Sequence, residues 1–295
     1  MRFSSRIIII LACIGTMSLF CWWLHAGPSL PLQAPGDPLK TNFTFTVDTF
    51  LHVQQLRKKK LRSFCRSHTE FQEFLSQDNL QQVILHMMVN TKLEFVYCWV
   101  PALGMDSWEQ LLHTLAESRH LTMRKPVNSI SVPLSALPVN YLRDFNATSI
   151  AMILRSYTKV LFIKDPFQRL VTAYMQRFAG EITFNDFIQM ILRTKSREVD
   201  VLWKPLVSLC WPCLVNYDYI LKYGFLGQEV HHLMGRLGMP TDLVPEFADA
   251  QFKWTDSWLG KQLASELSSE QKKQLHKAFL WDFAAFGFPD SQLQN

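Results

Sequence analysis

Two stretches of this 295-residue sequence pass directly from a buried strand into a helix, and they constrain the fold more than any other feature. One strand is predicted over 93–100, where aromatic and β-branched residues cluster, and the other over 160–163. Apolar residues that recur every three or four positions predict a helix after each strand. Because strands that lead straight into helices are typical of α/β folds, we expect a mostly parallel central sheet.

Start signals mark the helix after the second strand and one further helix. Asp165 is a good N-cap, and Pro166 suits the first helical turn because its missing N–H would have no partner there. The further helix is predicted to begin at Thr183, with Asp186 as its capping-box partner. Its expected buried face consists of Phe184, Phe187, Ile188 and Ile191.

The N-terminal region predicts a membrane anchor. Residues 7–24 carry no charged side chain, and this is about the length that crosses the hydrocarbon core as a helix. Leu24 stands where a cleavage site before Ala26 would need a small residue, which favours an anchor over a cleaved signal peptide. Arg2 and Arg6 precede the span, so the positive-inside rule places the short tail in the cytoplasm and the rest in a lumen.

The predicted anchor divides the chain into a cytoplasmic tail of residues 1–6, a lumenal stem of residues 25–48 and one domain of residues 49–295. The stem is rich in proline and lacks apolar periodicity, and no later Pro-rich or Gly-rich stretch splits the domain. Asn42 and Asn146 begin glycosylation acceptor tripeptides, which fits a lumenal position.

Four cysteines lie outside the predicted span, an even number that suits disulfide bonding in an oxidising compartment. They are Cys65, Cys98, Cys210 and Cys213. Three pairings are open, and the sequence does not choose among them. Because no second cysteine pair with zinc-ligand spacing accompanies Cys210 and Cys213, we expect structural disulfides and no metal.

The charge of the chain suits an anionic ligand without demanding nucleic acid. The formal net charge is +5, and charged residues make up 19% of the sequence. The densest basic run covers 57–60 together with Arg62, and no aromatic residues interleave with it. We therefore predict that this run is a solvated face, or a region near an anionic glycan, and not a nucleic-acid arm.

The ends of the two predicted strands are where a ligand should bind. Open α/β sheets bind ligands beyond the carboxyl ends of their strands, and a helix that starts there offers free N–H groups to an anion. Residues 101–108 would wrap one phosphate-like group, and Lys164 with Thr172 would hold another by charge and hydroxyl. Two neighbouring anion sites predict a nucleotide that is phosphorylated at both ends.

The candidate nucleotide-binding residues form two runs, and no catalytic residue is predicted with them. The candidates are Pro101, Ala102, Leu103, Gly104, Met105, Asp106, Ser107, Trp108, Lys164, Asp165, Pro166, Phe167, Gln168, Arg169, Leu170, Val171 and Thr172. Trp108 is also expected in the core, and Arg169 is expected either as a clamp behind the site or as a surface arginine.

Five blocks in fixed order resemble those of the membrane-bound carbohydrate sulfotransferases, a family that includes the HNK-1, chondroitin 4-O, dermatan 4-O and GalNAc 4-O enzymes. The resemblance covers roughly residues 57–288. The matching residues are Pro101, Gly104 and Trp108; Asp165, Pro166, Phe167, Arg169, Leu170 and Ala173; residues 203–205; residues 209–213 with 217–220; and residues 281–288.

The resemblance implies a P-loop-like, three-layer sulfotransferase fold behind an N-terminal transmembrane helix. It implies 3′-phosphoadenylyl sulfate (PAPS) as sulfate donor, with the 5′-phosphosulfate in the first loop and the 3′-phosphate in the second. The acceptor would be a hydroxyl of a GalNAc-type glycan or a glycosaminoglycan. The protein would be a single-pass type II glycoprotein of the Golgi membrane, and homodimerisation or heterodimerisation is left open.

The chain also departs from the family pattern at residues that the chemistry uses. Ala102 replaces a loop lysine, Asp106 a serine or threonine, and Leu202 a histidine, while Met105 replaces a frequent cysteine and Lys164 an arginine. The leading hypothesis is a Golgi carbohydrate sulfotransferase. The alternative is a catalytically impaired relative that binds a glycan or partners an active enzyme.

Overall fold

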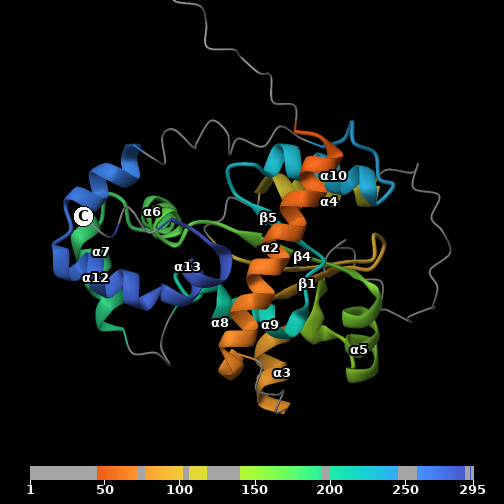
Figure 1. Ribbon diagram of the computed structural model, residues 1–295, viewed down its shortest axis with the longest axis horizontal. Helices are drawn as coiled ribbons and strands as arrows, with labels where there is room; N and C mark the ends of the chain where they lie inside the picture. Colours follow the sequence, from red (N-terminus) through yellow and green to blue (C-terminus); the bar gives the residue numbers. More distant parts are fainter. Residues whose placement is uncertain are drawn as a thin grey trace, which may run out of the picture. The chain divides into compact units, whose positions relative to one another are not determined.

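A five-stranded sheet forms the centre of the computed structural model (Figure 1), with the strand order β3-β1-β2-β4-β5. The strands are β1 (Met87–Asn90), β2 (Phe95–Cys98), β3 (Asn140–Tyr141), β4 (Thr158–Ile163) and β5 (Tyr219–Lys222). β2, β4 and β5 are parallel, and β1 is antiparallel to both of its neighbours. Four strands therefore run one way and β1 alone runs against them, so the expected mostly parallel sheet is confirmed.

The structure describes residues 45–71, 77–101, 106–117, 140–194, 200–244, 258–289 and 293. The predicted tail and anchor, the stem up to residue 44 and the acceptor Asn42 lie outside these residues. Among the helices that the structure describes, none has the length and apolar character to cross a bilayer.

Helices flank the sheet on both faces. Their bounds are α2 (Val47–Ser67), η1 (Thr69–Phe71), α3 (Gln77–Ile84), α4 (Asp106–Glu117), η2 (Leu142–Asp144), α5 (Ala147–Ser156), α6 (Pro166–Arg177), α7 (Phe184–Arg193), α8 (Leu206–Cys210), α9 (Pro212–Val215), α10 (Leu226–Arg236), α12 (Ser269–Ala278) and α13 (Leu280–Phe286). Residues 258–265 are also helical. Tyr97 of β2 packs edge-on against Trp108 of α4, whereas the next residue, Cys98, is bonded to Cys210 of α8. Because successive strand residues point to opposite faces, α4 and α8 cover different faces of the sheet.

The predicted helix starts are confirmed in detail. The Asp165 side chain accepts a hydrogen bond from the backbone N–H of Gln168, and Pro166 opens α6. The Thr183 side chain likewise accepts from the N–H of Asp186 at the start of α7. All four residues of the predicted buried face of α7 are buried.

Helix α2 covers the edge strand β5 with polar side chains. Gln54 donates to the carbonyl of Ile220 at 3.1 Å and accepts from its N–H at 2.8 Å, so it replaces a missing neighbouring strand. Arg57 donates to both carboxylate oxygens of Glu229, at 2.6 and 2.8 Å, and also to the carbonyl of Ile220. The prediction of a solvated basic run is therefore wrong for Arg57, whereas Lys59, Lys60 and Arg62 are exposed.

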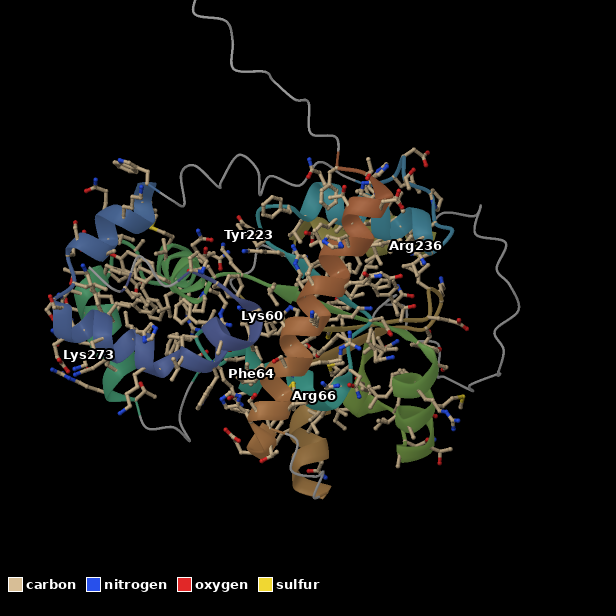
Figure 2. All side chains as sticks on the ribbon, in the orientation of Figure 1. Lys60, Phe64, Arg66, Tyr223, Arg236 and Lys273 are labelled. Atoms are coloured by element: carbon tan, nitrogen blue, oxygen red, sulfur yellow. A yellow bond between two sulfur atoms is a disulfide. The ribbon has the colours of Figure 1, made fainter. Side chains whose placement is uncertain are left out.

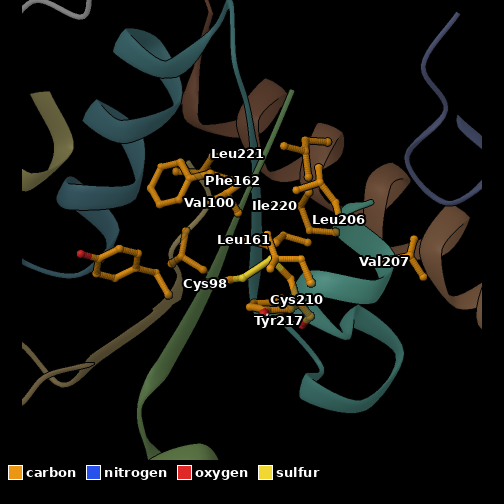
Figure 3. Close-up of a cluster of buried hydrophobic side chains, with 14 of the residues drawn as sticks. Cys98, Val100, Leu161, Phe162, Leu206, Val207, Cys210, Tyr217, Ile220 and Leu221 are labelled. Atoms are coloured by element: carbon orange, nitrogen blue, oxygen red, sulfur yellow. Dashed lines mark hydrogen bonds between the residues drawn. A yellow bond between two sulfur atoms is a disulfide. The ribbon is translucent and has the colours of Figure 1, made fainter. Parts of the chain in front are cut away.

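Two disulfides hold the four predicted cysteines, and they join Cys65 to Cys213 and Cys98 to Cys210. The second disulfide lies among buried apolar side chains of β4, β5 and α8 (Figure 3). Tyr217 packs beside it and donates its hydroxyl to the carbonyl of Cys210 at 2.8 Å. Both disulfides anchor the short segment around α9 to elements that lie far away in the sequence.

Asn146, the second predicted glycosylation acceptor, is the N-cap of α5. Its side-chain oxygen accepts from the backbone N–H of Ser149 at 2.8 Å, and the residue is exposed. Capping uses the amide oxygen and leaves the amide nitrogen, where a glycan would be attached, out of that bond. Glycosylation of Asn146 remains a prediction, and this geometry is compatible with it.

Candidate functional site: the carboxyl edge of strands β2 and β4

The two predicted anion sites follow strands that lie side by side. β2 and β4 are parallel, and Tyr97 pairs with Val160. Continuing this register places Pro101, after β2, level with Lys164, after β4. Helix α6 begins immediately beyond Lys164, so the positive end of its dipole lies at the same sheet edge.

Lys164 and Thr172 are brought together as predicted. The ammonium of Lys164 donates to the Thr172 hydroxyl at 2.7 Å, and the Thr172 hydroxyl donates to the carbonyl of Gln168 at 2.9 Å. The same ammonium lies 3.7 Å from the ring centroid of Tyr223. Lys164 is only 1% exposed, so its charge stays in a low-dielectric environment, where it acts strongly on an anion that approaches.

Asp165 places a carboxyl group at the start of α6. Burial raises the pKa of Asp165, while hydrogen bonds from the N–H groups of Gln168 and Phe167 and the charges of Lys222 and Lys164 oppose that rise. The carboxylate accepts a hydrogen bond in the first turn of the helix, which is the normal role of an N-cap. Asp165 therefore fixes the start of α6, and its carboxylate is engaged as the helix cap.

Arg169 is a buried clamp, and the alternative of a surface arginine is excluded because the side chain is 1% exposed. Its Nη2 donates to the carbonyl of Lys204, and Nη1 has no partner in the part of the chain that the structure describes. Burial lowers the pKa of Arg169 to about 10, and the charge of Asp282 opposes this effect. The guanidinium thus holds the segment before α8 against α6.

Asp282 completes this clamp from α13. Its carboxylate accepts from the N–H groups of Leu206 and Val207 at 2.7 and 2.9 Å, so it caps the start of α8. Burial raises the pKa of Asp282 to about 6, while Arg169 and these two N–H groups lower it. The block at 281–288 and the block at 203–205 therefore meet in space, where Asp282 caps α8 and Arg169 binds the carbonyl of Lys204.

Four further residues of the second run belong to the core, whereas Gln168 is partly exposed. Phe167, Leu170 and Val171 are each at most 3% exposed and pack under the sheet edge. Pro166 is buried in the first turn of α6. These four positions support the site and do not line it.

The first loop is described only at its two ends. Pro101 follows β2, and α4 begins at Asp106, but residues 102–105 and the side chains of Asp106 and Ser107 lie outside the description. Trp108 is fully buried and lies 4.9 Å from Phe162 between ring centroids, so it is the predicted core residue. Leu202 is half-buried, and its N–H donates to Asp200 at 2.9 Å.

The predicted site residues did not include Tyr223, Lys222 or Lys60. Tyr223 contacts the Lys164 ammonium, and Lys222 lies 4.9 Å from the ring centroid of Phe288. A Cβ on Gly287 would lie 2.7 Å from the Lys60 ammonium, so Lys60, on α2 (Figure 2), reaches over the same C-terminal block. The position of Lys222 and Tyr223 at the end of a strand was the only signal that could have indicated them.

Within the described residues, His, Cys, Asp and Glu form no group of three that could hold a metal ion. The absence of a metal in the protein stays an expectation from the sequence.

Comparisons with known proteins agree with the blocks in the sequence. A model of the sulfotransferase family matches residues 85–289. The chain is 25% identical to carbohydrate sulfotransferase 14 of Danio rerio, over 90% of this chain and 81% of the relative. It is 26% identical to carbohydrate sulfotransferase 12 of Xenopus laevis, over 80% of this chain and 69% of the relative. For carbohydrate sulfotransferase 9 of Homo sapiens the identity is 23%, over 80% and 60%. No solved structure matches significantly. The family match spans most of the described domain, and the chain therefore belongs to the sulfotransferase family of enzymes.

Proposed function

We propose that this protein transfers the sulfuryl group of PAPS to a hydroxyl of a glycan, with a GalNAc-type glycan or a glycosaminoglycan as acceptor. The observation that carries the proposal is the parallel register of β2 and β4. It brings Pro101, the residue before the first loop, and Lys164 to one sheet edge, where a nucleotide with phosphates at both ends can bridge the two predicted anion sites. The names of the relatives support glycan as the acceptor class.

Lys164 and Thr172 are assigned to the 3′-phosphate. The Lys164 ammonium supplies charge, the Thr172 hydroxyl supplies a donor, and the N-terminus of α6 adds the favourable end of the helix dipole. Arg169 is assigned a supporting role because its Nη2 is bound to the carbonyl of Lys204. The backbone amides of residues 103–108 and the Ser107 hydroxyl are assigned to the 5′-phosphosulfate.

The cellular location is part of the proposal. We place the domain in the Golgi lumen, tethered by residues 7–24 as a single-pass type II protein. The two disulfides support this placement, since such bonds persist in oxidising compartments. Dimerisation stays open.

A second candidate function is a catalytically silent relative that binds a glycan or partners an active enzyme, and Ala102, Asp106 and Leu202 favour it. Two measurements on the purified lumenal chain separate the candidates. The first is incorporation of labelled sulfate from PAPS into desulfated chondroitin, dermatan and GalNAc-capped glycans. The second is calorimetric binding of adenosine 3′,5′-bisphosphate (PAP).

The combined outcomes are decisive. Transfer of label together with PAP binding supports the enzyme. PAP binding without transfer to any acceptor supports the silent relative. Loss of both refutes the assignment of the nucleotide site.

A further inference from the structure

A cavity of about 570 Å³ lies along α2 and takes no part in the proposed nucleotide site. Side chains of α2, of α9 and of the residues that lead into β5 line it. β5 is parallel to β4, so the residues before β5 lie at the amino ends of these strands, whereas Lys164 follows the carboxyl end of β4. The cavity and the nucleotide site therefore lie at opposite ends of the parallel strands.

The disulfide between Cys65 and Cys213 forms part of the cavity wall. It joins α2 to α9, with 5.5 Å between the two Cα atoms, and both cysteines line the cavity. Because a covalent bond holds the two helices together at this point, the cavity exists before any ligand arrives. A preformed site binds its ligand without the cost of ordering its own walls.

Three basic side chains of α2 line the cavity at intervals of four residues: Lys58, Arg62 and Arg66. This spacing places them on one face of the helix, about 6 Å apart along its axis and about 12 Å from first to last. Like charges at this spacing repel each other, and a bound anion relieves that repulsion. Arg62 and Arg66 are exposed and Lys58 is half-buried, so a ligand in solution can reach the row (Arg66 is labelled in Figure 2).

Within the part of the chain that the structure describes, no carboxylate forms an ion pair with these three cations. Asp218 also lines the cavity, but its carboxylate accepts the N–H of Lys159 at 2.9 Å and pairs with the Lys159 ammonium at 3.1 Å. The Nε of Arg62 donates to the carbonyl of Lys58 at 3.2 Å, a bond that does not use the terminal N–H groups of the guanidinium. The cavity therefore carries a net positive charge and offers hydrogen-bond donors to a ligand.

A second cavity, of about 360 Å³, adjoins the first. The two share Asn216 and Asp218, and the second continues to residues of α3 and α5. Asn216, at the junction, is exposed. The joined cavities make an elongated hollow, which suits an extended chain better than a compact small molecule.

We propose that the basic face of α2 and the two joined cavities bind an acidic glycan chain, outside the centre where sulfate is transferred. The choice of a glycan rests on the proposed function, and it narrows the acceptor to a glycosaminoglycan with carboxylate or sulfate groups along its length. A row of cations at regular intervals matches a ligand with repeated anions, and each arginine offers a planar fork to a carboxylate or a sulfate. Single-stranded nucleic acid fits less well, because Tyr217 is the only aromatic residue among the described residues that line the hollow, and it is buried.

Basic side chains lead from this hollow toward the proposed nucleotide site. Lys60, two residues after Lys58 on α2, reaches Gly287, where a Cβ would lie 2.7 Å from the Lys60 ammonium. The ring of the next residue, Phe288, lies 4.9 Å from the ammonium of Lys222, the last residue of β5. A long glycan held in the hollow thus keeps its further sugar residues near the reaction centre and raises their local concentration there. Short acceptors gain nothing from such a site.

The first test is calorimetric binding of desulfated chondroitin polysaccharide to the full-length protein in neutral detergent. The triple variant Lys58→Gln, Arg62→Gln, Arg66→Gln should bind at least about tenfold more weakly, because charged hydrogen bonds to the ligand are lost. The remaining affinity should depend less on salt, since fewer cations are left to be screened. PAP affinity should stay unchanged, because the nucleotide is assigned to the other end of the strands.

The matched control removes three exposed cations from the C-terminal helices: Lys261→Gln, Lys273→Gln, Lys277→Gln. The net charge changes by the same amount in both triple variants, so overall attraction of a polyanion changes equally. The control should bind chondroitin as the wild type does. Equal losses in the two variants would show that chondroitin follows the charge of the whole protein, and the proposal would fail. It would also fail if the α2 variant kept the affinity of the wild type.

The second test uses the wild type alone, so it does not depend on the folding of any variant. Affinity for chondroitin fragments should rise with length until a fragment spans the distance of about 12 Å between Lys58 and Arg66, and then level off. A neutral GalNAc-capped glycan should not displace the polysaccharide. Affinity that is independent of length would exclude an extended site. Displacement by single-stranded DNA as effective as displacement by chondroitin would assign the hollow to nucleic acid instead.

The outcomes separate this inference from the proposed function. If the wild type transfers sulfate, KM for the polysaccharide should rise in the α2 variant, while kcat and KM for a short acceptor stay constant. Sulfate transfer with unchanged polysaccharide KM and binding in that variant removes the glycan site and leaves the proposed function intact. Chondroitin binding that depends on the α2 cations, without transfer to any acceptor, supports the glycan site and refutes the proposed transfer.

Discussion

At the scale of single residues, the two ends of β4 offer a matched comparison of buried lysines. Lys164 donates to Thr172 at the edge assigned to the nucleotide. Lys159, at the opposite end, donates to the carbonyl of Tyr157 at 3.1 Å and pairs with Asp218 at 3.1 Å. Both are nearly fully buried, but Lys164 lies at the sheet edge where we propose that a phosphate binds, and Lys159 does not.

Replacing Lys164 by Met should weaken PAP binding by about 10–100-fold, the effect of losing one charged hydrogen bond to phosphate. Lys159→Met should leave PAP affinity unchanged, because the Lys159 ammonium forms an ion pair with Asp218 at the other end of the strand. Calorimetric titration of both variants measures the difference. Equal losses in the two variants, or none in Lys164→Met, would remove Lys164 from the site.

Ala102 tests whether activity is limited by the missing loop cation. A lysine at this position would meet charge on the leaving phosphate, and one positioned donor is worth about 10²–10³-fold in rate. Ala102→Lys should therefore raise kcat for sulfate transfer by up to this factor. Ala102→Met supplies a similar side-chain length without charge and should give no gain. A rise in both variants would point to packing of the loop and not to charge.

At the scale of elements, the clamp between α6, α8 and α13 should carry much of the stability of this region. The Asp282 carboxylate accepts two backbone N–H groups at the start of α8, and its charge opposes the cost of burying Arg169, so Asp282→Asn weakens both interactions. Hydrogen bonds to a charged group contribute about 1.5–3 kcal/mol, so the free energy of unfolding should fall by at least about 1.5 kcal/mol.

The comparison for that prediction is Asp144→Asn, which breaks an exposed pair with Arg143 at 3.9 Å. Exposed pairs contribute about 0–1 kcal/mol, so this variant should unfold close to the wild type. Urea denaturation followed by circular dichroism measures both variants. Similar midpoints for the two would mean that the clamp does not stabilise the fold.

The sequence predicted the elements whose signals are local. The caps of α6 and α7 depend on residues three positions apart. Most residues of β4 are apolar and buried, a composition that is typical of a strand. The two-residue strand β3 and the strand β1 were missed because short strands are defined by their partners and not by propensity.

Contacts between distant elements explain the other misses. Arg57 looked like part of a solvated run, but its partners Glu229 and Ile220 lie 172 and 163 residues further along the chain. Whether Arg169 is a buried clamp or a surface arginine was left open for a similar reason. An arginine in the second turn of a helix is buried only if another element supplies its acceptor, here the carbonyl of Lys204.

At the scale of the whole molecule, the fold class followed from two strand-to-helix units, whereas the disulfide pairing did not. All three pairings of four cysteines are compatible with the sequence. The structure selects one because α2 lies beside α9, while β2 ends beside α8. The two bonds consequently differ in their access to solvent.

This difference predicts an order of reduction. Cys98 and Cys210 are both fully buried, whereas Cys65 and Cys213 line a surface cavity of about 570 Å³. Three basic side chains of α2 line the same cavity: Lys58, Arg62 and Arg66. Thiol–disulfide exchange proceeds by attack of a thiolate that needs access to sulfur, and these cations should raise the local concentration of an anionic thiolate.

Glutathione under native conditions should therefore open Cys65–Cys213 well before Cys98–Cys210, and the bias should weaken as salt screens the cations. Timed alkylation followed by peptide mass mapping identifies which cysteines become free. In urea, where both bonds are equally accessible, the order should disappear. Opening of Cys98–Cys210 first under native conditions would contradict the buried position of that bond and, with it, the packing of α8 against the sheet.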